Sequence, residues 1–95
     1  MATITGKTKT GFTFKIDEEA RDDMELMEAF IGMSKGDYSV VPDIIVGLLG
    51  EEQKKKLYEH CRDKRTGRVL SKKVYKEVEN IMEIAREKAE QTKNS

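Results

Sequence analysis

"GFTFKIDEEARDDMELMEAF", residues 11–30, is the stretch in which the hydrophobic pattern changes from that of a strand to that of a helix. Phe12, Phe14 and Ile16 alternate with polar residues, and this period of two predicts a strand with one apolar face. Upstream, "TITGKTKTG" supplies β-branched residues and turn glycines, so residues 1–16 are predicted to form a β-hairpin or two short strands. Because two strands alone are marginally stable, we expect a helix to cover the aromatic face.

The segment after this strand has the pattern of an acidic amphipathic helix. Asp17 is a suitable N-cap, and the acids that follow it favour the positive end of a helix macrodipole. A first helix is therefore predicted from Asp17 to about Met33. Its apolar residues recur at steps of four, three and four and form one stripe: Ala20, Met24, Met27 and Ile31, with Phe30 adjacent.

A second helix is predicted to start near Asp37 or Ser39, with Pro42 in its first turn, where the missing amide proton costs nothing. This segment has few polar residues, so we expect it to lie at the centre of the core. Gly50 is predicted to end it.

Two more helices are expected in the second half of the chain. The third begins at Glu51 and is closed by Gly67, and the following "RVL" is expected to be extended, with the hairpin as a possible partner. Ser71 is predicted to cap a fourth helix. Its apolar positions repeat at helical spacing: Val74, Val78, Ile81, Met82, Ala85 and Ala89.

Together these elements predict a mainly α protein of the α+β class. A β-hairpin region, 1–16, is followed by a helical region, 17–90, of about four helices in a small orthogonal bundle, and by a frayed tail, 91–95. Ninety-five residues form one domain, 1–95, and leave no room for separate cofactor and substrate domains.

Composition indicates a cytoplasmic setting without a membrane segment. The single cysteine excludes an intramolecular disulfide framework. The longest apolar run, "VVPDIIVGLL", is interrupted by Pro42 and Asp43 and is much shorter than the ~20 residues that a membrane helix needs. The N-terminus has no export-signal pattern.

Net charge is zero, but the charges are segregated. Residues 17–28 hold seven acids and one arginine, a net charge of −6, whereas residues 51–76 hold ten basic residues and four acids, a net charge of +6. These blocks can pair within one molecule, or head to tail between molecules, and salt should weaken either pairing.

The stretch "LLGEEQKKKLYEHCRDKRTGRV", residues 48–69, contains the only His and the only Cys. His60 and Cys61 are adjacent, so on a helix they point about 100° apart and cannot form an i, i+4 metal-binding pair. We therefore expect Cys61 to be a small core residue and His60 to be partly exposed.

No catalytic or cofactor motif is present. With Gly67 at the sixth position of a calcium loop, the first, third and twelfth positions would be Arg62, Lys64 and Lys73, which are cations. Serine-hydrolase, phosphate-loop and zinc-protease motifs are also missing. The sequence thus predicts a non-enzymatic protein without catalytic residues, metal site or cofactor.

Nucleic-acid binding is the alternative that the basic block raises. Ten basic residues could contact phosphates, and a helix-turn-helix around "TGRVLS" is conceivable. However, the pI is about 6.6, far below the value of about 9 that is usual for such domains, and the acidic helix opposes approach to a polyanion. A small nucleic-acid-binding or regulatory domain of a mobile element therefore ranks second.

Three stretches resemble the tail assembly chaperones of phages and prophages of Gram-positive bacteria: residues 11–30, residues 48–69 and "VYKEVENIMEIA", residues 74–85. The resemblance covers roughly residues 10–85. It implies a small, mainly helical protein that binds the tape measure protein and recruits tail-tube subunits in the bacterial cytoplasm, with self-association possible. It implies no catalytic residues.

Exposed apolar surface with adaptable methionines would suit that role, although the same methionines could instead fill an ordinary core. The candidate protein-binding residues are Met24, Met27 and Phe30 on the acidic helix and Lys54, Lys55, Arg62 and Arg65 in the basic segment.

Overall fold

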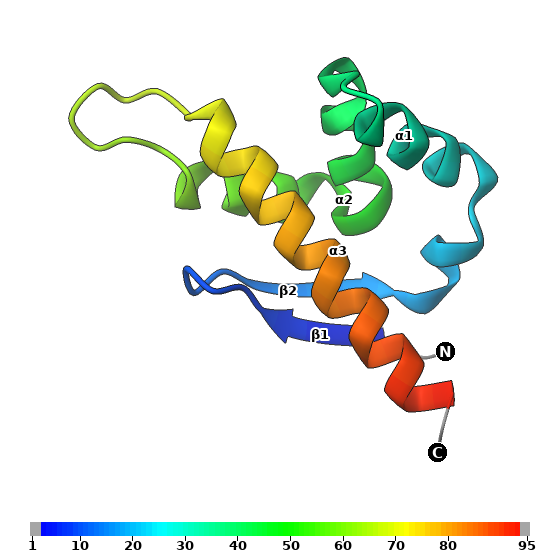
Figure 1. Ribbon diagram of the computed structural model, residues 1–95. Helices are drawn as coiled ribbons and strands as arrows, with labels where there is room; N and C mark the ends of the chain where they lie inside the picture. Colours follow the sequence, from blue (N-terminus) through cyan, green and yellow to red (C-terminus); the bar gives the residue numbers. More distant parts are fainter. Residues whose placement is uncertain (1–2, 94–95) are drawn as a thin grey trace.

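The computed structural model describes residues 3–93, without the side chains of residues 21 and 90–93. A two-stranded hairpin is followed by three α-helices and two short 3-10 segments, which confirms the α+β class (Figure 1). The elements are β1 (Thr3–Lys7), β2 (Thr13–Asp17), η1 (Glu18–Asp22), α1 (Met24–Ser34), η2 (Tyr38–Val40), α2 (Val41–His60) and α3 (Ser71–Lys93).

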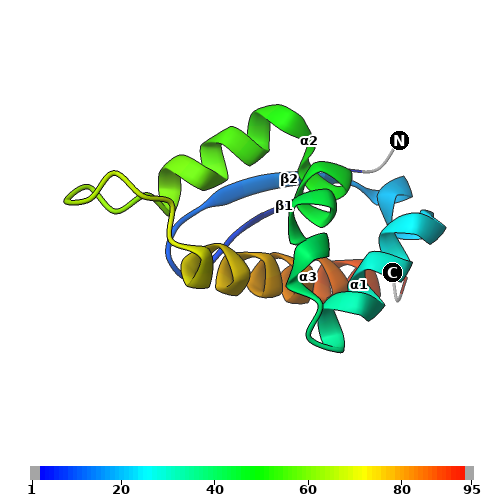
Figure 2. The same ribbon diagram turned by 90° about the horizontal axis from the view of Figure 1, so that it is seen from above.

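β1 and β2 pair antiparallel, with Thr5 opposite Lys15, and the alternation puts Phe12, Phe14 and Ile16 on the buried face as predicted. Figure 2 shows the hairpin between α2, which packs on β2, and α3, which packs on β1. The two helices thus supply the cover that a two-stranded sheet needs.

Side chains from the flanking helices close both edges of the sheet. The amide of Gln53 on α2 accepts from the Lys15 N–H at 2.8 Å and donates to the Lys15 carbonyl at 2.8 Å, as a neighbouring strand would. On the other edge, Lys88 of α3 donates to the Thr5 carbonyl. Capped edges are poor templates for the addition of another strand.

The predicted first helix starts too early. Asp17 accepts from Glu19 N–H and caps only the 3-10 segment η1. Asp23 then takes an extended conformation, and its carboxylate accepts from the N–H groups of Glu25 and Leu26, so α1 begins at Met24. The periodicity of the apolar residues predicted one continuous helix. Two aspartate caps, six residues apart, divide this segment into η1 and α1.

The expected second and third helices are a single element, so the described residues form three helices rather than about four. α2 starts at Val41 with Pro42 in its first turn, as predicted. Gly50 has φ 81° and ψ 168°, which bends α2 sharply, but helical residues continue directly after it. Gly50 interrupts the helix where the sequence indicated and does so without a loop.

α2 also ends earlier than expected, at His60 and not at Gly67. Residues 61–70 form a loop that projects from the body of the molecule (Figure 1). Gly67, at φ 75°, belongs to a turn in which its N–H donates to the Asp63 carbonyl at 2.7 Å. Val69 forms an antiparallel bridge with Arg62, so the "RVL" segment pairs within the loop rather than with the hairpin.

α3 begins close to the predicted position, but Ser71 is its first helical residue and not its cap, since the Leu70 carbonyl accepts from the N–H groups of Lys73 and Val74. The helix runs to Lys93, so residues 91–93 are helical rather than part of a frayed tail; residues 94–95 lie outside the described part. The core contains Ile16 from β2, Ile44 and Leu57 from α2 and Ile81 from α3, each at most 1% exposed. Between Thr3 and Lys93, none of the helices combines the length and apolar character needed to cross a membrane.

Candidate protein-binding groove

The position of α1 is set by one buried side chain and one glycine. Leu26 is the buried residue of α1, and it packs on α2 at Gly47. A Cβ at Gly47 would lie 2.9 Å from Leu26 Cδ1, closer than real Cβ contacts. The missing side chain therefore lets α1 approach α2 closely at this point.

An open apolar groove of about 590 Å³ lies where α1, α2 and α3 meet. Its apolar lining consists of Met27, Phe30 and Met33 from α1, Leu48 from α2, and Met82 and Ala85 from α3. The volume is in the range typical of ligand pockets, and three of the six side chains are flexible thioethers.

The apolar stripe predicted on the first helix is largely exposed. Met24 is 64% exposed, Met27 47% and Ile31 49%, whereas the core contact is made by Leu26, which the predicted stripe did not include. The sequence left open whether the methionines lie on an exposed surface or fill the core. Met24 and Met27 lie on an exposed surface. An exposed apolar helix face beside an apolar groove is typical of an interaction site.

The charged residues at the groove are mainly acidic. Glu79 and Glu83 of α3 line it together with the one cation Arg86, and α1 carries exposed Glu25 and Glu28 beside its methionines. The edge of the groove therefore carries more negative than positive charge, as does α1, which forms one of its walls. Such an edge favours a ligand with basic residues beside its apolar surface.

The structure divides the sequence-predicted contact residues between two places. Met27 and Phe30 line the groove, and Met24 lies on the exposed side of α1. Lys54 and Lys55, in contrast, lie on the second half of α2, with the Lys54 ammonium 5.5 Å from the centre of the Tyr58 ring.

The two arginines of the predicted set lie in the projecting loop. Arg62 bonds to Glu59 at 2.8 Å and donates to the Gly67 carbonyl at 2.6 Å, so it helps to hold the loop. Arg65 is exposed, and its N–H donates to Asp63. Neither belongs to the groove lining.

Sequence reasoning missed Met33, Leu48 and Met82 as groove residues. It treated Met82 as one member of a core repeat and Leu48 as part of the most apolar helix. No periodicity could single them out, because a groove depends on where the other two helices leave space.

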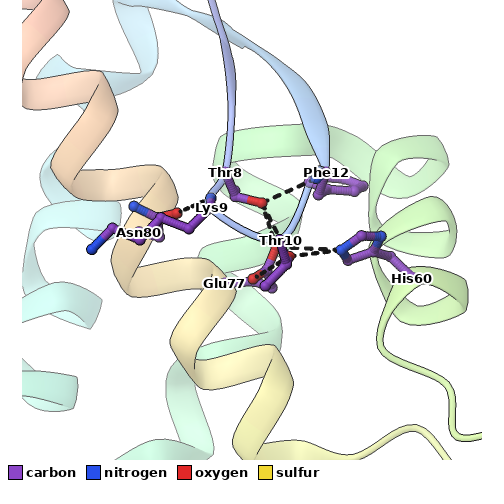
Figure 3. A network of polar contacts seen from close by, with 7 residues as sticks. All are labelled: Thr8, Lys9, Thr10, Phe12, His60, Glu77 and Asn80. Atoms are coloured by element: carbon purple, nitrogen blue, oxygen red, sulfur yellow. Dashed lines mark hydrogen bonds and ion pairs between the residues drawn. The ribbon is translucent and has the colours of Figure 1, made fainter.

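A polar cluster at the other end of α3 joins the hairpin turn to two helices (Figure 3). Glu77 is 4% exposed and accepts hydrogen bonds from the hydroxyls of Thr8 at 2.7 Å and Thr10 at 2.9 Å. His60 Nε2 lies 2.8 Å from Thr10 Oγ1 and 3.7 Å from Glu77. Because the Thr10 hydroxyl gives its only hydrogen to Glu77, Nε2 must carry a hydrogen and donate to Thr10.

Sequence reasoning did not single out Glu77, although a signal was present. Glu77 lies between Val74 and Val78 on the apolar side of the helical repeat, where a carboxylate has to be hydrogen-bonded. The hydrogen bonds of the cluster join the hairpin turn to Glu77 of α3 and His60 of α2, so the arrangement fastens the hairpin to both helices.

Cys61 adjoins this cluster, and its chemistry is that of a core thiol. The side chain is buried as predicted, and burial, followed by the nearby charge of Glu77, raises its pKa from 9.0 to about 11. The thiol is therefore protonated at neutral pH and is a poor nucleophile. Among the side chains that the structure describes, no group of three His, Cys, Asp or Glu residues is arranged to hold a metal ion.

Comparison with models of known protein families, with curated proteins and with solved structures gave no match to this chain.

Proposed function

We propose that this chain is a tail assembly chaperone of a phage or prophage, which binds the tape measure protein through the groove between α1, α2 and α3 and recruits tail-tube subunits. It acts in the cytoplasm of the bacterial host and has no catalytic step. The observation that carries the proposal is the groove itself, which is apolar, rich in methionine and flanked by an exposed apolar helix face.

The chemistry of the groove specifies the bound segment. An amphipathic helix can place its apolar side chains at i, i+3, i+4 and i+7 against Met27, Met33 and Met82. Flexible thioethers adapt to many such segments, which a chaperone for a long repetitive helical client requires. The acidic balance at Glu79 and Glu83 favours a segment whose apolar stripe is bordered by Lys or Arg.

Co-expression with a fragment of the tape measure protein from the same genome tests this function. The wild-type chain should keep the fragment soluble and co-purify with it. Met27→Glu should weaken the complex by at least about tenfold, or ~1.4 kcal/mol, because a carboxylate would enter the apolar groove. Ile31→Glu is the matched control, since Ile31 is on the same helix, is 49% exposed against 47% for Met27, and does not line the groove.

Equal losses in the two variants would assign binding to the outer face of α1 and contradict the groove. Failure of the wild-type chain to solubilise any tape measure fragment would contradict the chaperone function. Tight binding to duplex DNA at about 150 mM salt, with a steep salt dependence, would instead favour the nucleic-acid-binding alternative.

A further inference from the structure

A second surface, unrelated to the groove, lies on the outer face of the hairpin. Here a cleft of about 600 Å³ is surrounded by four lysines from four different elements: Lys7 of β1, Lys15 of β2, Lys56 of α2 and Lys88 of α3. Thr5 and Thr13 lie between them. No carboxylate lines this surface, which we call the basic cleft.

Three of the four lysines of the basic cleft have no carboxylate partner among the described side chains. Lys7, Lys15 and Lys56 form no ion pair with a described carboxylate; the ion pairs found among the described side chains are His60–Glu77 and Arg62–Glu59. Like charges collected around one cleft repel one another, and a bound anionic group would relieve this repulsion.

The complementary charge is present on the same chain. Residues 17–28 carry a net charge of −6, and neither of the ion pairs above includes a residue from this block. Asp17 and Asp23 serve as helix caps, which leaves other carboxylates, including the exposed Glu19 and Asp22, facing solvent. The acidic segment follows directly from the end of β2 (Figure 1). The basic cleft is lined by residues of both strands.

We propose that the basic cleft binds the acidic segment, residues 17–28, of a second copy of this chain. The two surfaces differ, so the contact is head to tail, and each bound copy leaves one basic cleft and one acidic segment open for the next. A net charge of zero favours this partner over nucleic acid, because the acidic block that repels a polyanion attracts another copy. The proposal is independent of the groove and of the client.

The mass of the purified chain in solution tests the proposal, starting from the 10.9 kDa monomer. At about 20 mM salt the average mass should increase with concentration, and at about 0.5 M salt it should return to that of the monomer, since screening shortens the Debye length. Lys7→Glu/Lys15→Glu abolishes the positive charge of the basic cleft. Glu19→Lys/Asp22→Lys removes most of the negative charge of the acidic segment and leaves the caps Asp17 and Asp23 unchanged. Each double variant alone should be monomeric.

Mixing the two double variants is the decisive step. One still has a working acidic segment and the other a working basic cleft, so the mixture should form dimers and nothing longer. Lys64→Glu/Lys72→Glu is the matched control, with the same change of net charge at exposed lysines outside the cleft, and it should still assemble. Circular dichroism of every variant checks that the fold is retained.

Four results would overturn the proposal: a monomeric wild-type chain at low salt, a mixture that stays monomeric, a control that loses assembly as completely as the cleft variant, or binding of duplex DNA that Lys7→Glu/Lys15→Glu abolishes. Association should weaken by at least about tenfold in each cleft or acidic-segment variant. Because no client is present in these experiments, failure of the proposed chaperone function would leave their outcome unaffected.

Discussion

Glu77 is the residue at which the hairpin, α2 and α3 are joined. Its carboxylate is buried and accepts from two threonine hydroxyls, one of which also accepts from His60. Burial of polar groups costs little free energy while each of them is hydrogen-bonded. Loss of one partner leaves the others buried without a hydrogen bond. The attachment of the hairpin turn to α2 and α3 therefore depends on every hydrogen bond of this cluster being formed.

Replacement of Glu77 by alanine should lower the free energy of unfolding by about 3 kcal/mol, because it leaves the hydroxyls of Thr8, which is buried, and of Thr10 without their acceptor. Chemical denaturation measures the loss. Glu87→Ala, an exposed position on the same helix, should change stability by no more than about 0.5 kcal/mol. Equal effects at the two positions would show that the cluster does not stabilise the fold.

Because of Cys61, the free energy of unfolding should decrease at alkaline pH. Its pKa is raised from 9.0 to about 11 in the folded chain, so above about pH 9 the unfolded chain loses the thiol proton while the folded chain retains it. The contribution is complete below pH 9 and is lost as pH rises towards 11. Denaturation of the wild type and of Cys61→Ala between these pH values should give a steeper decrease for the wild type; parallel curves would contradict the shift.

α2 shows how a single residue changes the course of an element. Gly50 has φ 81° and ψ 168°, a conformation that L-residues rarely adopt, and a Cβ placed there would meet no atom within 4 Å. The restriction is therefore one of backbone conformation and not of space. On one side of the bend Gly47 packs against Leu26 of α1, and on the other side Gln53 bonds to Lys15 of β2.

Gly50→Ala should therefore destabilise the protein by about 1–3 kcal/mol, since the strain cannot be relieved by moving a neighbour. Gly32→Ala makes a useful contrast: Gly32 lies within α1, and its nearest neighbours would be 3.9 Å from the new Cβ. That variant should gain about 0.5–1 kcal/mol from helix propensity. Thermal denaturation compares them, and a stabilising effect at position 50 would contradict the bend.

At the scale of the whole molecule, the acidic and basic blocks lie on surfaces that do not pair internally. Neither ion pair formed by the described side chains joins residues 17–28 to residues 51–76. The sequence allows the two blocks to pair within one molecule or between molecules. Within one molecule, the described side chains of the two blocks form no ion pair with each other. The charges are available for other molecules.

Salt should accordingly change the stability of the isolated monomer very little. Between about 0.05 and 0.5 M salt, the free energy of unfolding should change by less than about 1 kcal/mol, because exposed ion pairs contribute little and the blocks are not in contact. Denaturation of Lys7→Glu/Lys15→Glu, which cannot self-associate if the proposal is right, measures the monomer. A large loss of stability with salt would mean that the blocks attract each other within the fold.

Features that depend on residues close together in the sequence could be predicted, and features that depend on distant residues could not. The apolar face of β2, the start of α3 near Ser71 and the burial of Cys61 follow from alternation, helical spacing and residue type. The start of α1 was predicted wrongly because Asp17 and Asp23 are equally good caps by residue type. In the structure Asp17 caps η1 and Asp23 caps α1, and Leu26 of α1 packs on α2.

The candidate site was predicted only in part for the same reason. Met27 and Phe30 were selected from the pattern of one helix, whereas Met82 needed a third helix to be placed beside them. The cluster around Glu77 joins residues up to 69 positions apart, and no spacing along the chain encodes that contact.

The sequence by itself determined the class of fold, the positions of the strands and of α3, the break at Gly50 and the segregation of charge, because these depend on neighbours a few residues away. Only the tertiary structure decided that Leu26 rather than the methionine stripe enters the core, that three helices leave an apolar groove, and that lysines from four elements surround one cleft. The physical reason is that burial and charge environment arise from packing between distant segments, which local periodicity does not specify.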